Sequence, residues 1–481
     1  MGAGKDDDSG RDAQGSAVRT AFAALLRDAR AGDDPGLWLT LDAEARYAGR
    51  YRAAGRPPWR DPGGPASSDE AGLALGLCHG DGRIRERALR HAAAHPALLP
   101  LVVIRTADWA APVRERAREM LRGTIDVTAA VDLAPLALLV ARRERGDAAL
   151  ALIGAVLRTA DGEDLLPLLR HTDRGVRRFA HRLTVAEGLL TPGELARTAA
   201  RDEDAVVQTL CAEAALAGLA DAGGEPRGAD ADEVLAPLLA ARGPQVRAAG
   251  VTALRRTGRP EHARDFLADR SALVRACARY VLRQYGVDPL PWYRSRCADA
   301  GGPPPLRPGA VIGLAECGGR ADAELLAPLL AHPRPGVRAR AVAGLRLLGA
   351  ADPVVLLPLL DDPAPGVVRE ATTALLPWAR SLDEALLTAR LAPGRPRQAR
   401  VAAFRLLDAC GGLVRLRAAT ALLEDRDDRL RTWAGQSVQG WHATPDVPRG
   451  ATEVGELLDR ARHLFSPYVL RRRAREAGID G

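Results

Sequence analysis

The sequence predicts an all-α fold, a solenoid of about twelve two-helix repeats with capping helices at its two ends. At 481 residues, the chain exceeds the roughly 250–300 residues that one hydrophobic core usually serves. It must therefore contain several domains or a repeat array. Aromatic residues make up 4% and there are two Met, so Ala and Leu supply most of the packing, which favours helices over strands. A motif that recurs about every 31 residues favours the repeat array.

The repeat is found from a column of arginines. Arg338, Arg369, Arg400 and Arg431 follow one another at intervals of 31 residues. Towards the N-terminus the column continues at similar intervals through Arg145, but Glu144 and Gln208 depart from the V-R step and predict two distorted repeats. Three residues after each of the twelve positions stands a small residue, and Leu follows after seven in eight of them. These offsets place the residues on one face of a helix. The arginines of this predicted structural ladder are Arg85, Arg114, Arg177, Arg247, Arg275, Arg307, Arg338, Arg369, Arg400 and Arg431.

Each arginine-bearing helix is preceded by a turn and by a second apolar helix. The turns contain Pro, Gly and Asp, as in HPRPG from His332, and the earlier helices include ELLAPLLA from Glu324. Pro237, Pro328 and Pro358 are expected to kink those earlier helices or to mark their first turns. Four residues before an anchor stand Asp81, Asp173, Asp204 and Asp427. We expect the arginines to bind such aspartates or backbone carbonyls across adjacent turns. The alternative is that the arginines face a ligand.

The assembled motif, as in LLDDPAPGVVREATTAL at residues 359–375, resembles the short bacterial HEAT repeat that also occurs in phycobilin lyases. The resemblance covers roughly residues 70–445. It implies a right-handed, armadillo-like superhelix in which the second helix of each repeat lines a concave face used as a scaffold or recognition surface. It implies no catalytic set. Lys5 is the only lysine among 68 Lys and Arg, which fits a high-GC bacterial source.

The ends of the chain differ from the repeats. Residues 1–16 are polar and rich in Gly and Asp, which predicts a disordered tail. We expect an N-terminal helical cap and a loop over residues 17–69, the HEAT-like array over 70–445, and C-terminal capping helices over 446–481. Such caps cover the last apolar face of a solenoid.

The most distinctive candidate partner-binding segment runs from Arg279 to Cys297, where aromatic and arginine residues alternate. Such side chains anchor interfaces. The candidates are Tyr285, Trp292, Tyr293, Arg294 and Arg296. The alternative is that Trp292 and Tyr293 fill the core of a bulky repeat. Two acid-free runs, Arg242 to Arg259 and Arg390 to Arg405, are candidate phosphate-binding stripes or plain solvated helix faces.

Catalytic, cofactor and metal sites are not predicted, although the sequence leaves the question of enzymatic activity open. The six cysteines include no CxxC pair, and His91 and His95 have no third ligand at metal-binding spacing. Cys317 and Cys410 occupy the same repeat column, which favours a packing role. Phosphate-binding and nucleophile-elbow motifs are missing from the sequence.

These observations favour a noncatalytic scaffold that binds a partner macromolecule, above all a protein, on its concave surface. The alternative is a nucleic-acid-binding protein related to HEAT-like alkylpurine DNA glycosylases, which need an acid beside aromatic residues. Asp108 with Trp109 and Asp288 with Trp292 are the pairs adjacent in sequence. A lyase or chaperone for a tetrapyrrole-carrying protein is a third hypothesis. The net charge of +7 permits an acidic partner without requiring one.

Neither a signal sequence nor a membrane-spanning run is found. The N-terminal stretch has no apolar core that would direct export, and no apolar run reaches the roughly 20 residues that span a bilayer. We therefore expect a cytoplasmic protein, and we infer no small-molecule substrate and no cofactor.

Overall fold

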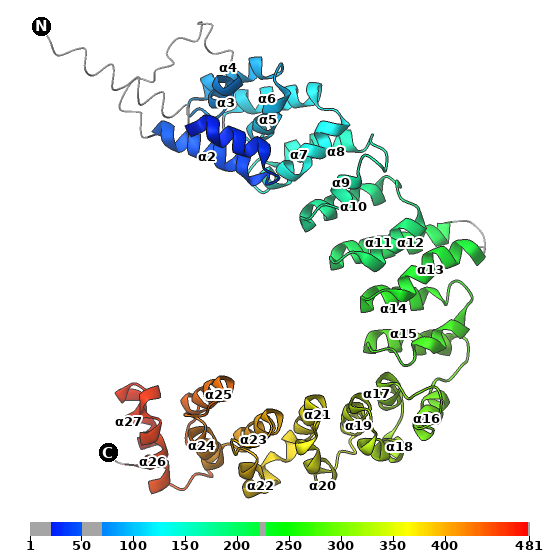
Figure 1. The fold of residues 1–481 in the computed structure, drawn as a ribbon, viewed down its shortest axis with the longest axis vertical. Coiled ribbons are helices and arrows are strands. Elements are labelled where there is room, and N and C mark those ends of the chain that lie inside the picture. The colour runs from blue at the N-terminus through cyan, green and yellow to red at the C-terminus, as the bar shows by residue number, and fades with distance from the viewer. Residues whose placement is uncertain (1–20, 51–69, 222–227, 480–481) are drawn as a thin grey trace, which may run out of the picture. The chain divides into compact units, whose positions relative to one another are not determined.

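A computed structural model describes residues 21–50, 70–221 and 228–479. Across those ranges the chain forms α-helices and short 3-10 helices, with no strand (Figure 1). The helices fit about twelve two-helix repeats, which confirms the predicted all-α solenoid class. The chain divides into two compact units, unit 1 at Met1–Arg242 and unit 2 at Gly243–Gly481, and each is described by itself.

Unit 1 begins, within the described residues, with a helix over residues 21–31. Its further helices are α2 (Gly36–Arg50), α3 (Glu70–Leu77), α4 (Gly82–Ala92), η2 (Pro96–Leu98), α5 (Leu99–Arg105), α6 (Ala111–Thr124), α7 (Val127–Val140), α8 (Asp147–Leu157), α9 (Leu166–Leu169), α10 (Arg174–Ala186), α11 (Pro192–Arg201), α12 (Ala205–Asp221) and α13 (Gly228–Ala240).

Unit 2 continues the alternation of a short first helix and a longer second helix. Its helices are α14 (Pro244–Ala253), η3 (Pro260–Phe266), α15 (Ala272–Gln284), α16 (Leu290–Ala298), α17 (Pro308–Cys317), η4 (Arg320–Asp322), α18 (Ala323–Leu326), η5 (Ala327–Ala331), α19 (Pro335–Leu347), α20 (Pro353–Leu356), η6 (Leu357–Asp361), α21 (Pro365–Leu375), η7 (Leu376–Ser381), α22 (Glu384–Ala389), α23 (Arg397–Cys410), α24 (Gly412–Ala421), α25 (Asp428–Gln439), α26 (Thr452–Arg460), η8 (Arg462–Leu464) and α27 (Pro467–Glu476).

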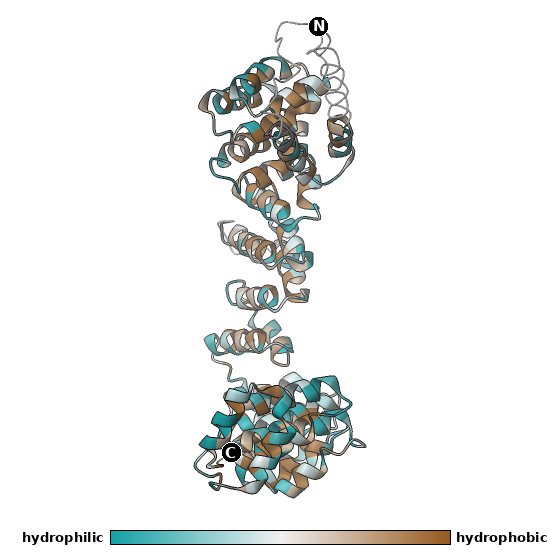
Figure 2. Ribbon diagram, turned by 90° about the vertical axis from the view of Figure 1, so that its left-hand side faces the viewer, coloured by the Kyte–Doolittle hydropathy of each residue, from teal (hydrophilic) through white to brown (hydrophobic). Residues whose placement is uncertain are grey.

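The second helices of successive repeats pack on one another within each unit. Contacts join α4 with α6, α10 with α12, α17 with α19 and α19 with α21. A small residue three positions after the anchor lies buried at this junction in most repeats, as Ala117, Ala278 and Ala341 do. A small side chain lets the neighbouring helix approach closely. Polar and apolar residues alternate along many single helices (Figure 2), because these helices bury one face, whereas α5 and α17 are buried over most of their length.

The first helices of several repeats are interrupted where proline occurs. Pro328 lies at the change from α18 to η5, and Pro358 at the change from α20 to η6, whereas Pro237 lies inside α13. Proline has no N–H to donate to the carbonyl four residues earlier, so the next turn tightens to the 3-10 form. These first helices are therefore short and bent.

The array is flanked by further helices. The helix over residues 21–31 and α2 precede the first repeat, and α26 and α27 follow α25. The predicted tail at residues 1–16 and most of the predicted loop before residue 70 lie outside the described residues. Within the described parts of the chain, no helix combines the length and apolar character needed to cross a membrane.

Candidate protein-binding surface

The anchor arginines hold each second helix to the turn before it. Arg338 is the fourth residue of α19, and its Nη1 donates to the carbonyls of His332 at 2.9 Å and Pro333 at 3.2 Å. Arg85 and Arg177 make the same pair of bonds to residues six and five positions earlier. These bonds satisfy carbonyls where the first helix ends. The side chains of these arginines are therefore engaged in contacts within the chain.

The same arginines also bind a carboxylate of the next repeat. Arg338 donates from Nε and Nη2 to the two Asp362 oxygens, each at 2.8 Å. Each partner aspartate also accepts, through one carboxylate oxygen, the N–H two residues later, as Asp362 does from Ala364. Four other pairs repeat this arrangement within one unit: Arg85–Asp108, Arg177–Asp202, Arg247–Asp269 and Arg400–Asp425.

Several of these aspartates accept hydrogen bonds from the arginines of two successive repeats. The carbonyl of Asp108 accepts from Arg114 at 2.8 Å, while its carboxylate accepts from Arg85. Asp425 likewise binds Arg431 through its carbonyl and Arg400 through its carboxylate. One residue thus joins the arginines of two successive repeats. We call this chain of contacts the Arg–Asp ladder.

The aspartates that the sequence analysis paired with the ladder have another role. Asp81, Asp173 and Asp427 are N-cap residues whose side chains accept helix N–H groups, as favourable capping requires. Asp204 accepts from Val206 and Val207 in the same way. The expected bonds to backbone carbonyls are present. The carboxylate that binds each arginine, however, belongs to the next repeat and stands six residues before that repeat's anchor, not four.

Two predicted ladder arginines lie outside the ladder. Because α21 begins at Pro365, its fourth residue is Val368, and Arg369 is exposed with Glu370 as an ion-pair partner at 3.9 Å. Arg307 is the N-cap residue of α17 and is exposed. The constant 31-residue interval therefore missed a shift of register in these repeats. Gln208, by contrast, occupies the proper position and donates to the Asp202 carbonyl at 2.6 Å.

A pH-dependent contribution is expected from Asp204. Hydrogen bonds from Arg178, at 2.7 and 2.9 Å, lower the pKa of Asp204 to about 2. A carboxyl whose folded-state pKa is depressed stabilises the fold above its ordinary pKa and loses that contribution as the pH falls towards the folded value. Asp204→Asn should therefore lower the free energy of unfolding at pH 6, and its difference from wild type should shrink between about pH 4 and pH 2. Urea unfolding across this range measures the difference, and a constant difference would contradict the prediction.

Asp108 does not lie in an open cleft. Its carboxylate is buried between Arg85, which donates at 2.7 and 2.9 Å, and Arg105, which donates at 3.1 Å. Arg105 in turn pairs with buried Asp42. Trp109 is 65% exposed and lies over the Arg85 guanidinium at 5.6 Å. This geometry leaves no Asp108 oxygen aimed at a substrate, so the acid–aromatic pair of the glycosylase alternative is not assembled here.

Tyr293 is a core residue rather than a surface anchor. It is fully buried, its hydroxyl donates to the Leu267 carbonyl at 2.8 Å, and burial raises its pKa to about 12. Arg279 lies beside that hydroxyl and donates to Glu316 at 2.7 Å. Burial by itself would raise the pKa of Glu316, but hydrogen bonds from Arg275 and Arg279 outweigh it and hold the pKa below its usual value. This cluster supports the packing of α15, α16 and α17.

The other candidates from the segment differ in accessibility. Trp292 is half-buried and meets Tyr293 edge-on, with ring centroids 5.1 Å apart. Arg294 donates to Asp322 at 2.6 and 3.2 Å, and Arg296 donates to the Pro304 carbonyl. Asp288 is exposed and accepts the N–H of Leu290. Of the five candidates, Tyr285 is the one whose ring lies open, at 46% exposure.

Tyr285 belongs to an aromatic and basic surface on two neighbouring second helices. Its hydroxyl donates to the Arg255 carbonyl at 2.8 Å, which joins the ends of α14 and α15. Tyr280 is 45% exposed, and Arg283 follows it by one helical turn. Arg255 and Arg256 are exposed at the matching end of α14. We call Arg255, Arg256, Tyr280, Arg283 and Tyr285 the α14–α15 surface.

This surface carries one sign of charge. Neither α14 nor α15 contains Asp or Glu. The acid-free run of Arg242 to Arg259 includes α14. The sequence alone did not indicate that this run lies next to Tyr280 and Arg283 of α15. The repeat register contained the missing signal, because Arg255 and Arg283 both stand eight residues after their anchors, Arg247 and Arg275.

The two cysteines of the shared repeat column bond to backbone carbonyls within the fold. Cys317 donates to the Gly313 carbonyl at 3.2 Å, and Cys410 to the Ala379 and Leu406 carbonyls, each at 3.2 Å. Burial raises the pKa of both thiols. Nowhere in residues 21–50, 70–221 and 228–479 do three His, Cys, Asp or Glu side chains gather as metal ligands would.

Comparisons with known proteins bear on the fold alone. No protein-family model matches the chain, and no curated protein matches it. A chain from the structure of Kap95p binding to RanGDP is 11% identical, with a TM-score of 0.38, over 95% of this chain and 66% of that one. A structure of microtubule polymerase TOG domain arrays is 12% identical, with a TM-score of 0.24, over 76% of this chain and 99% of that one. A crystal structure of Kap121p is 14% identical, with a TM-score of 0.26, over 86% of this chain and 48% of that one. This chain thus spans about half the length of Kap121p.

Proposed function

We propose that this protein is a noncatalytic repeat scaffold that binds a partner protein through the α14–α15 surface. The observation that carries the proposal is the open Tyr280 and Tyr285 rings beside Arg255, Arg256 and Arg283, on helices without an acid. Tyr and Arg are the side chains that most often anchor protein interfaces. The lack of acids on both helices favours an acidic segment as the partner.

A protein partner fits this surface better than a nucleic acid does. The Tyr285 hydroxyl is bonded to the Arg255 carbonyl, so the open ring is held in a fixed position, as a preorganised interface anchor is. The net charge of +7 is spread over 481 residues, whereas nucleic-acid binding needs a concentrated basic footprint. Asp108, the acid nearest an exposed tryptophan in sequence, is held by Arg85 and Arg105.

Site-specific crosslinking tests the proposal. A photoreactive phenylalanine analogue replaces Tyr280 in the full-length protein, which is irradiated in a lysate of its own cells. Tyr468 on α27, 63% exposed, receives the same analogue as a matched control for an open aromatic position. We expect one protein to crosslink at position 280 and not at 468. We also expect Arg283→Ala to weaken that crosslink about tenfold, since interface arginines often contribute more than 1 kcal/mol.

Two outcomes would overturn the proposal. The first is an identical set of crosslinked proteins at positions 280 and 468, because the α14–α15 surface would then select nothing. The second is a crosslink at position 280 to RNA or DNA whose yield falls steeply with salt, the behaviour of a phosphate-binding surface. That second result would favour the nucleic-acid alternative.

The wider expectations accompany this proposal. We propose that the repeats belong to the short bacterial HEAT type, that the α14–α15 surface lies on the concave side formed by second helices, and that the protein works in the cytoplasm. The two-helix repeat, the packing of second helices and the Arg–Asp ladder support the first point. We propose no cofactor and no small-molecule substrate.

A further inference from the structure

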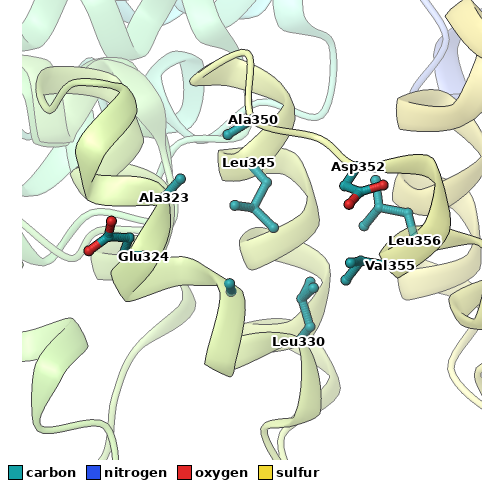
Figure 3. Close-up of a pocket in the computed structure, with 9 residues that line it drawn as sticks. Ala323, Glu324, Leu330, Leu345, Ala350, Asp352, Val355 and Leu356 are labelled. Carbon is teal, nitrogen blue, oxygen red and sulfur yellow. The ribbon is translucent and has the colours of Figure 1, made fainter.

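An apolar groove lies between the first helices of two neighbouring repeats in unit 2. Leu330 of η5, Val355 and Leu356 of α20, and Leu345 of α19 line it, as Figure 3 shows. Its volume of about 250 Å³ is below the roughly 300–1,000 Å³ of small-molecule sites. The groove therefore has room for apolar side chains but not for a typical small-molecule ligand.

Beside this groove the chain exposes apolar residues where other repeats expose glutamate. Val354 is 80% exposed. It stands fourteen residues before Val368, the fourth residue of α21, which is the second helix of the same repeat. At the same position five other repeats have an exposed Glu, namely Glu163, Glu194, Glu233, Glu261 and Glu324. The repeat after Val354 has Leu386 there, 47% exposed. Because Glu fits this position five times, packing within the chain does not require Val354 or Leu386.

The two residues belong to adjacent repeats. Arg390, the residue after α22, donates to Asp361 at the end of η6 at 2.7 Å, which ties the first helix of one repeat to that of the next. Equivalent positions on packed helices lie about 8–10 Å apart. Val355, itself 49% exposed, extends the apolar strip into the groove. We call Val354, Val355 and Leu386 the apolar strip.

Acidic groups border the strip and the groove. Glu324 and Asp352 lie on opposite walls of the groove (Figure 3), and both are exposed. Asp352 uses one carboxylate oxygen to accept the N–H of Val354. Glu384, near Leu386, is bonded to Arg417 at 3.3 Å. The surroundings therefore favour an occupant with positive charge beside its apolar side chains.

We propose that the apolar strip and its groove are a second docking site, for a basic amphipathic helix of a partner protein. Seven residues of an α-helix span about 10.5 Å, close to the roughly 8–10 Å between the axes of packed helices. Apolar residues at i and i+7 of the partner would contact Leu386 and Val354. Because the groove lies on the other side of Val354 from Leu386, an apolar residue one turn further along, at i+10 or i+11, would enter it. Lys or Arg on its flanks would face Glu324 and Asp352. This site is separate from the α14–α15 surface.

A binding titration with a defined probe tests this site. The probe is a fluorescent 18-residue helical peptide with Leu at i, i+7 and i+11 and Lys on its polar face. A second peptide has Glu in place of Lys. We expect the full-length protein to bind the Lys peptide and not the Glu peptide. Val354→Glu should weaken binding about tenfold, and adding Leu386→Glu about tenfold more, because each removes one buried apolar contact.

Val206→Glu is the matched control, since it makes the same change at an exposed valine of α12 in unit 1. It should leave binding unchanged, and thermal unfolding should show that Val354→Glu folds, as its five glutamate-bearing counterparts suggest. Equal binding by wild type and Val354→Glu would overturn this proposal, as would no binding of the Lys peptide or equal binding of both peptides. Loss of binding on Arg283→Ala alone would assign the peptide to the α14–α15 surface and would also overturn it.

Discussion

Asp108→Asn is expected to lower the free energy of unfolding of unit 1 by about 3–5 kcal/mol, the usual effect of removing one partner from a buried ion pair. Asp108 accepts from Arg85 and Arg105, and both arginines are buried. Neutralising the carboxylate leaves buried Arg85 without its carboxylate partner and leaves Arg105 with Asp42 alone, in a medium of low polarity. Urea unfolding of the full-length protein, followed by circular dichroism, measures the change as an earlier transition of the N-terminal repeats.

The matched control for this experiment is Asp81→Asn in the preceding repeat, which carries Arg85. Asp81 is an exposed N-cap residue of α4 that accepts the N–H of Arg83 at 2.8 Å. Asn caps helices about as well as Asp, so we expect a change below about 0.5 kcal/mol. Equal effects of the two substitutions would mean that the Asp108 cluster gains little from its charges, and this part of the interpretation would have to be abandoned.

Gly313→Ala should destabilise unit 2 by about 1–3 kcal/mol, the cost of overfilling a packed core. A Cβ at position 313 would overlap Cε1 of Tyr293 and lie 2.7 Å from its Cζ. The ring has no room to retreat, because Tyr293 is fully buried and its hydroxyl is bonded to the Leu267 carbonyl. Thermal unfolding of the variant should show a clear fall in Tm.

A double-mutant cycle separates this clash from general effects of alanine. In a Tyr293→Ala background the overlapping ring is gone, so Gly313→Ala should lose its penalty. Gly366→Ala in α21 is the matched control, because no atom lies within 4 Å of its added Cβ. Ala favours a helix over Gly, so this control should be neutral or slightly stabilising. A penalty that persists without the Tyr293 ring would refute the packing argument.

The repeat architecture was predictable because one chemical task recurs at one helix position. In many repeats the fourth residue of the second helix donates to carbonyls of the preceding turn, as Arg85, Arg177 and Arg338 do. That recurring contact leaves a visible period in the sequence. The period failed at Arg307 and Arg369, where the helix begins at another point relative to the arginine. A fixed interval has no means of detecting such a shift.

The partners of the ladder and the candidate surfaces were harder to predict. The aspartate that binds each arginine comes from the next repeat, as Asp362 does for Arg338, so its identity depends on how repeats stack. Tyr293 and Tyr285 are alike as residues in the sequence, yet one is buried and the other open. Helix packing makes that distinction. Val354 could have been noticed from its register alone, by comparison with Glu324 and its counterparts.

The Arg–Asp ladder has a consequence for where the array can bend. Arg338 donates to carbonyls of its own turn, which are neutral, and forms an ion pair with Asp362 of the following repeat. The uncharged side-chain amide of Gln208 donates to the Asp202 carbonyl of its own turn. It cannot form an ion pair with a carboxylate of the next repeat. Bending should therefore be easiest beside such residues, and amide protons of the flanking turns should exchange fastest there. The stiffness of the solenoid would then be set repeat by repeat, by the choice of a single side chain.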